Sequence, residues 1–166
     1  MKGTMRHRKV GCLLCGLLVV MPQIAVGAKD ATITVKVTVV APPPCIINNN
    51  QPITVEFGDV MTTRVDGNNY RRPVNYTLSC TAGLPNAMKL QVVGVGASFN
   101  GTVLWTTNSR LGIQLLQDST KLPINTWLNF TYPKKPVLWA VPVKQPSATL
   151  TGGEFVAGAT MKVDYQ

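Results

Sequence analysis

The stretch Gly153-Glu-Phe-Val-Ala-Gly-Ala-Thr-Met-Lys-Val-Asp-Tyr-Gln166 predicts a β-strand with one buried face. Small and apolar residues recur at every second position, which is the period of a half-buried strand. The predicted inward face carries Phe155, Ala157, Ala159, Met161, Val163 and Tyr165. The given chain supplies no segment after Gln166 to pair with this strand, and an unpaired edge attracts another strand. We therefore expect a partner to pair with this edge.

The segment Ala31-Thr-Ile-Thr-Val-Lys-Val-Thr-Val-Val40 is a second alternating strand, near the other end of the chain. Its apolar face carries Ile33, Val35, Val37 and Val39, and its polar face carries Thr32, Thr34, Lys36 and Thr38. Three prolines follow at positions 42–44, where they remove N–H donors and favour a stiff, extended spacer. The separated strand suggests head-to-tail assembly, in which each copy completes the sheet of the next. Pairing within its own domain stays open as the alternative.

Residues 1–28 have the pattern of a secretory signal peptide, so we expect the protein to be exported. The pattern consists of the basic residues Lys2, Arg6, Arg8 and Lys9, an apolar run from Val10 to Met21, and the small residues Ala25-Val-Gly-Ala28. The apolar run is too short to span a bilayer. Without this segment the chain has twelve basic and seven acidic residues, a net charge of +5. This mild excess does not favour a nucleic-acid or membrane ligand.

The cysteines predict one disulfide. Cys12 and Cys15 lie inside the apolar run of the signal peptide, so their C-x-x-C spacing is not interpreted as a redox or metal motif. Cys45 and Cys80 remain, and an even count in an exported protein favours a bridge. The bridge would close a loop of about 35 residues and stabilise the fold by roughly 3 to 4 kcal/mol.

Short alternating segments between turn signals favour an all-β sandwich of the immunoglobulin-like kind. Such segments are residues 53–57, 74–80, 88–92 and 111–116, and no window after the signal peptide has helical periodicity. About 138 residues after the signal peptide suit one domain.

The sequence lacks the parts of common catalytic and metal sites. Its one histidine, His7, lies in the signal peptide, which leaves no histidine base for a nucleophilic triad. The seven carboxylates are dispersed, and neither a free thiol nor an Asp-x-Asp loop is expected to hold a metal. We expect no enzyme, no cofactor and no small-molecule substrate.

Several motifs together resemble the pilin subunits of the bacterial chaperone-usher pathway, and most closely the minor tip or adaptor subunits of P-type fimbriae. They are the alternating extension from Thr32 to Val40, Pro-Pro-Cys-Ile-Ile-Asn-Asn at 43–49, Val55-Glu-Phe-Gly58, Tyr76-Thr-Leu-Ser-Cys80, Leu111-Gly-Ile-Gln-Leu115 and Gly-Gly-Glu-Phe at 152–155. Pilins of this family carry a glycine fourteenth from the C-terminus and a tyrosine second from it. These positions are Gly153 and Tyr165 here.

The resemblance implies an incomplete immunoglobulin-like sandwich of six strands, completed by a donor strand from a partner. It divides the chain into a signal peptide (1–28), a donor-strand extension (29–44) and a pilin domain (45–166). It implies a periplasmic chaperone that pairs with the strand from Gly153 to Tyr165, an outer-membrane usher, and neighbouring subunits on both sides in a fimbrium outside a Gram-negative cell. Many family extensions carry a central glycine, which residues 32–40 lack. The register of this donor strand is therefore open.

Other functions within the same architecture also stay open. A major rod pilin would share every motif above. A receptor-binding adhesin of this pathway would be about twice as long and would lack the extension carrying Ile33 to Val39, and a terminator subunit would not need one. A complete, monomeric β-sandwich such as a periplasmic chaperone would leave the spare strand unexplained.

Overall fold

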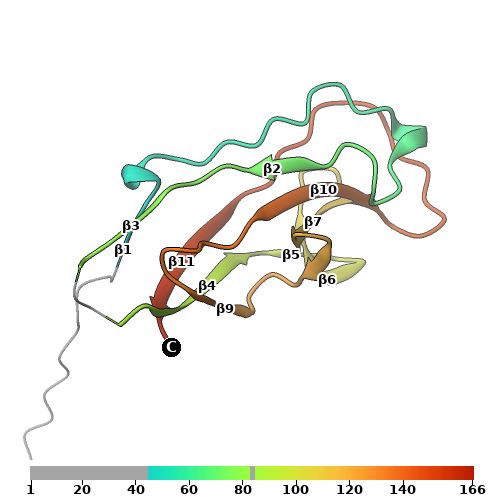
Figure 1. Cartoon of the computed structure of the whole chain (residues 1–166). Helices are drawn as coiled ribbons and strands as arrows, with labels where there is room; N and C mark the ends of the chain where they lie inside the picture. Colours follow the sequence, from blue (N-terminus) through green and yellow to red (C-terminus); the bar gives the residue numbers. More distant parts are fainter. Residues whose placement is uncertain (1–44, 83–84) are drawn as a thin grey trace, which may run out of the picture. The chain divides into compact units, whose positions relative to one another are not determined.

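The computed structural model describes residues 45–82 and 85–166, which all lie in the second of two compact units, Val39–Gln166. The predicted signal peptide and donor strand lie outside the described residues. The described part contains eleven strands and two short 3₁₀ helices (Figure 1). They are β1 (Cys45–Ile47), η1 (Asn48–Asn50), η2 (Thr62–Arg64), β2 (Arg72–Val74), β3 (Leu78–Cys80), β4 (Ala87–Gly94), β5 (Gly96–Ala97), β6 (Asn100–Trp105), β7 (Leu111–Gln117), β8 (Thr120–Leu122), β9 (Trp127–Thr131), β10 (Leu138–Lys144) and β11 (Ala159–Tyr165).

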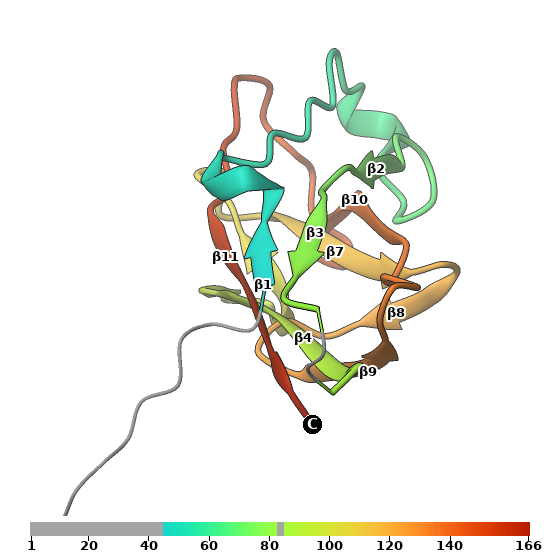
Figure 2. The same cartoon turned by 60° about the vertical axis from the view of Figure 1, so that its left-hand side comes forward.

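The strands form three antiparallel sheets, visible from two sides in Figures 1 and 2. The largest has the order β2-β10-β7-β6-β5 with β8 paired to β7, the second is β11-β4-β9, and the third is β1-β3. The all-β immunoglobulin-like class predicted from the sequence is confirmed. The described part contains eleven strands because predicted strands are interrupted: β2 ends at Val74 and β3 begins at Leu78, and the two pair with different strands.

The core joins the first two sheets. Met88 and Leu90 of β4 pack in one cluster with Ile113 of β7 and Leu138 of β10, and these side chains are almost wholly buried. Alternate residues of β4 point inward, as the period of a strand requires. The sequence therefore sets the buried face of β4, and the packing of the two sheets buries most of β7 and β10 on both faces.

Three predicted strands differ from the structure. The strand predicted for residues 74–80 is divided into β2 and β3, because residues 75–77 between them belong to no strand. Residues 53–57 keep their alternation, with Ile53, Val55 and Phe57 half-buried, but they pair with no strand among the described residues. The strand predicted for residues 153–166 is paired only over β11. Ala159, predicted to face inward, is exposed. At residues 53–57 and 153–158 the described structure has no strand between the two segments that could pair with them.

The disulfide predicted from the sequence is present. Cys45 of β1 and Cys80 of β3 face each other in register, with 4.0 Å between their Cα atoms. The bridge fastens the start of the described fold to the strand that leads toward β4.

Tyr76 anchors the loop before β10 to the core. Its buried hydroxyl donates a hydrogen bond to the carbonyl of Pro136 at 2.7 Å, and the Lys135 ammonium lies 4.3 Å from the centre of its ring. Burial raises the pKa of the Tyr76 phenol well above its usual value, so the hydroxyl keeps the proton that it donates even in alkaline solution.

The disulfide predicts the thiol content of the exported protein. Denatured but unreduced protein should bind no thiol reagent, and after reduction it should bind two equivalents, because Cys45 and Cys80 are the only cysteines after residue 28. Mass spectrometry after labelling measures this. Two reactive thiols before reduction would contradict the bridge.

Replacing Tyr76 with phenylalanine should lower the free energy of unfolding by about 1 to 3 kcal/mol, because the carbonyl of Pro136 would be left buried without its donor. Denaturant unfolding measures the change. Tyr132→Phe is the matched control, since Tyr132 is half-buried and its hydroxyl makes no hydrogen bond among the described residues. Equal losses in the two variants would contradict this role for Tyr76.

Candidate functional site

An open groove separates two extended segments that belong to no sheet. The first wall, residues 51–60, follows η1, and the second wall, residues 152–158, leads into β11. Figure 1 draws the first wall as a plain tube along the edge of the fold. Neither wall carries a strand pairing among the described residues.

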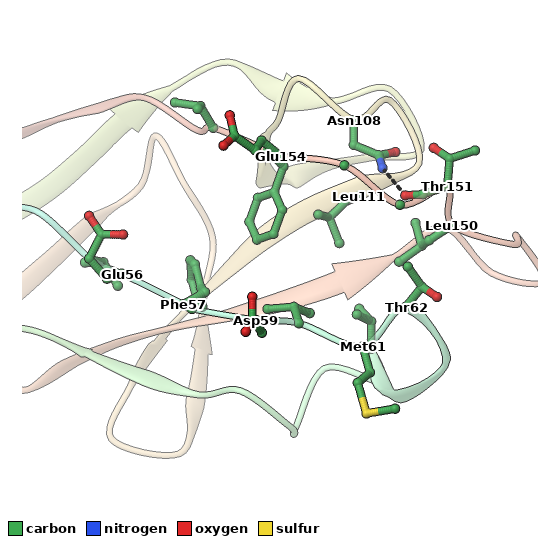
Figure 3. Close-up of a pocket in the computed structure, with 18 residues that line it drawn as sticks. Glu56, Phe57, Asp59, Met61, Thr62, Asn108, Leu111, Leu150, Thr151 and Glu154 are labelled. Carbon is green, nitrogen blue, oxygen red and sulfur yellow. Dashed lines mark hydrogen bonds between the residues drawn. The ribbon is translucent and has the colours of Figure 1, made fainter.

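The groove has two adjoining compartments. The first compartment has a volume of about 740 Å³ and is bounded by the far part of the first wall, by η2 and by residues 150–154 (Figure 3). The second compartment has a volume of about 750 Å³ and runs from β1 and the near part of the first wall to β11. Five residues line both compartments: Val55, Glu56, Phe57, Phe155 and Val156.

The floor of the groove is the hydrophobic core itself. Buried side chains of four strands line the second compartment, namely Val92, Leu104, Ile113, Leu115, Leu138 and Ala140. A smaller buried cluster of Val65, Leu111 and Leu150 lines the first compartment. A side chain entering the groove from outside would therefore pack directly against the core.

The backbone of both walls is largely without partners. Residues 53–60 make no hydrogen bond between backbone groups in the described structure, and their one bonded carbonyl, that of Phe57, accepts from Arg72 at 3.3 Å. In the second wall, Val156 exchanges bonds with Thr107. Extended backbone with free N–H and C=O groups is a template for another strand. The groove thus offers two pairing edges above an apolar floor.

Phe57 and Phe155 make an aromatic contact across the groove. Their ring centroids lie 5.9 Å apart with the planes tilted by 38°. Each ring comes from a different wall, and both residues border the two compartments. This contact marks the boundary between the compartments.

The predicted C-terminal site residues lie along this groove. Gly153 lines the first compartment, and its φ of +130° is a conformation that favours glycine. Phe155, Ala157, Ala159 and Met161 line the second compartment. Val163 and Tyr165 lie further along β11 and pack against the core cluster. Strand β11 pairs with β4 on one side only among the described residues, so its other edge is open.

Sequence reasoning did not identify the first wall or the floor as parts of the site. Ile53, Val55 and Phe57 showed the alternation of a strand, and alternation does not reveal whether a strand has a partner. The floor combines residues from β4, β6, β7 and β10, which together extend from Val92 to Ala140 in the sequence. Only the tertiary arrangement brings them together.

Other kinds of site are not found in the described part of the chain. No group of three or more metal-binding side chains occurs there. No helix among the described residues is long and apolar enough to cross a membrane. Asp66 has a lowered pKa because it accepts the backbone N–H groups of Asn69 and Asn68, but it does not line the groove.

Comparison with known proteins agrees with this geometry. A model of the fimbrial protein family matches residues 32–166. The fimbrial-like protein YfcR of Escherichia coli K12 is 41% identical over 160 residues, covering 93% of this chain and 89% of YfcR. The fimbrial adapter PapF of Escherichia coli is 32% identical over 138 residues, covering 74% of this chain and 81% of PapF. A solved structure of the P pilus adaptor subunit PapF matches with a TM-score of 0.56 and 30% identity, over 75% of this chain and 97% of that chain. The chain belongs to the fimbrial protein family.

Proposed function

We propose that this protein is a minor, adaptor-type subunit of a fimbrium on the cell surface, whose groove accepts a strand from a neighbouring subunit. One observation carries the proposal: two unpaired extended walls flank a groove whose floor is the hydrophobic core. The similarity to the adapter PapF favours the minor subunit over a rod subunit.

A donor strand would both pair with the free backbone of the walls and cover the apolar floor. Its backbone would pair with the free groups of the walls, and its alternate side chains would enter the two compartments. Each aliphatic side chain buried in this way contributes roughly 1.5 to 3 kcal/mol, offset by the cost of ordering the donor.

The chain would also donate a strand. Ile33, Val35, Val37 and Val39 form the apolar face that would enter the groove of the next subunit. This role requires the division into a signal peptide (1–28), a donor extension (29–44) and a pilin domain (45–166). The prolines at 42–44 would keep the extension away from its own domain.

Assembly would proceed through temporary partners. We expect a periplasmic chaperone to fill the groove first and to pair with the free edge of β11. At an outer-membrane usher, the donor strand of a neighbouring subunit would then replace the chaperone in the groove. The open edge of β11 and the half-buried Val163 and Tyr165 support such a pairing. No catalytic step is part of this proposal.

An appended donor strand should stabilise the isolated chain. The protein without residues 1–28 should aggregate or be degraded when expressed alone, because its groove and edges invite association. A copy of residues 31–40 joined after Gln166 through a flexible linker should give a stable monomer. Size-exclusion chromatography and thermal unfolding measure this.

The matched control is the same fusion with threonine at the four apolar positions, Ile33, Val35, Val37 and Val39, of the appended copy. It should behave like the unfused chain, since the backbone pairing survives but the groove stays empty. A stable monomer from the unfused chain would contradict the strand-accepting role.

Substitutions at the two ends of the chain should block assembly at different steps. Tyr165→Ala removes a side chain packed on the core at the open edge, so the subunit should be lost from the periplasm. Val37→Asp places a charge on the buried face of the donor, which costs several kcal/mol. That variant should still accumulate with the chaperone but should be absent from fimbriae.

Thr38→Asp is the matched control, because it adds the same charge to the outward face of the extension. Immunoblots of periplasmic fractions and of sheared fimbriae measure both steps. Normal incorporation of the Val37→Asp variant into fimbriae would contradict the donor role proposed for residues 32–40.

A further inference from the structure

The groove is lined by acidic residues in a basic protein. Glu56, Asp59 and Glu154 line the first compartment, and Glu56 also lines the second. No lysine, arginine or histidine is among the described residues that line either compartment. The whole chain has sixteen basic residues and only seven acidic ones. Three of the seven acidic residues therefore lie at this one groove.

The three carboxylates stand on both sides of the opening. Glu56 and Asp59 belong to the first wall and Glu154 to the second, as the close-up in Figure 3 shows. All three residues are exposed. Glu56 lies between the half-buried Val55 and Phe57, so it points away from the floor. Glu154 also points away from the floor, because the next residue, Phe155, is half-buried.

None of these carboxylates forms an ion pair in the described structure. The only ion pair among the described residues is Lys89 with Asp164, which do not line the groove. Arg72 and Arg110 approach the neighbourhood, but their guanidinium groups bond to the carbonyls of Phe57 and Thr149, at 3.3 Å each. The three rim carboxylates therefore outnumber these two cations, and neither cation pairs with them.

We infer that the groove selects a neighbouring subunit's donor strand that carries a lysine or arginine on its outward face. This inference rests on the proposed strand-accepting role. A strand lying between the walls has its outward side chains flanked by those of the walls, and cross-strand pairs lie about 4.5 to 5.5 Å apart at Cβ. Opposite charges stabilise such pairs, and like charges destabilise them. An acidic donor is thus disfavoured by both walls.

The apolar floor cannot make this distinction by itself. Any alternating strand of suitable size would bury similar apolar area, because burial is not directional. The alternation of residues 31–40 predicts a strand of the required kind, with Lys36 on the face opposite Val35 and Val37. They therefore provide a suitable probe strand.

The test uses three fusions that differ at one position of the donor strand appended after Gln166: Lys36 unchanged, Lys36→Gln and Lys36→Glu. At low ionic strength, Lys36→Glu should lower the equilibrium constant for folding about fivefold relative to lysine, with glutamine between them. In about 1 M salt, where the Debye length is about 3 Å, the three should converge. Denaturant unfolding of the monomeric fusions measures the constants.

The matched control neutralises the rim with Glu56→Gln, Asp59→Asn and Glu154→Gln. In that chain the three donors should be equally effective at low salt. Equal stability of the three donors in the unaltered groove would overturn the charge selection and leave the strand-accepting role intact. Failure of every fusion to fold would overturn that role, and this inference with it.

Discussion

The unpaired backbone of the two groove walls is the constraint that governs this structure, because it leaves the fold open to a further strand. Residues 53–60 and the segment before β11 are extended, yet their N–H and C=O groups have few protein partners among the described residues. Extended backbone in this state is stabilised by another strand. Because the floor between the walls is the core cluster, the same strand would complete both the hydrogen bonding and the packing. The donor strand that would join this subunit to its neighbour would therefore also complete its fold.

The remainder of the fold holds the groove open and in shape. The disulfide between Cys45 and Cys80 fixes the strand that precedes the first wall, and the Tyr76 hydroxyl secures the approach to β10 on the floor side. Across the groove, Phe57 and Phe155 provide an aromatic contact between the walls. The apolar floor would supply the affinity for a donor, and the acidic rim would decide among donors of equal apolar area.

Much of this could be predicted from the sequence because the signals are local. Alternation identified the inward residues of β4 and those of β11 other than Ala159, and the even cysteine count after residue 28 identified the disulfide. The same alternation was misleading at Ile53, Val55 and Phe57, where the residues face inward but form no sheet. A period of two reports which side of a segment meets the core, and it carries no information on what lies beside the segment.

The local pattern of the sequence was sufficient for the class of the fold, the buried face of β4 and a spare alternating segment. Only the tertiary structure decided that the two walls face one another over the core, and that Glu56 and Asp59 of one wall share an opening with Glu154 of the other. About a hundred residues separate these walls in the chain, so no local pattern connects them. Their meeting follows from the packing of the two sheets, which is a long-range property.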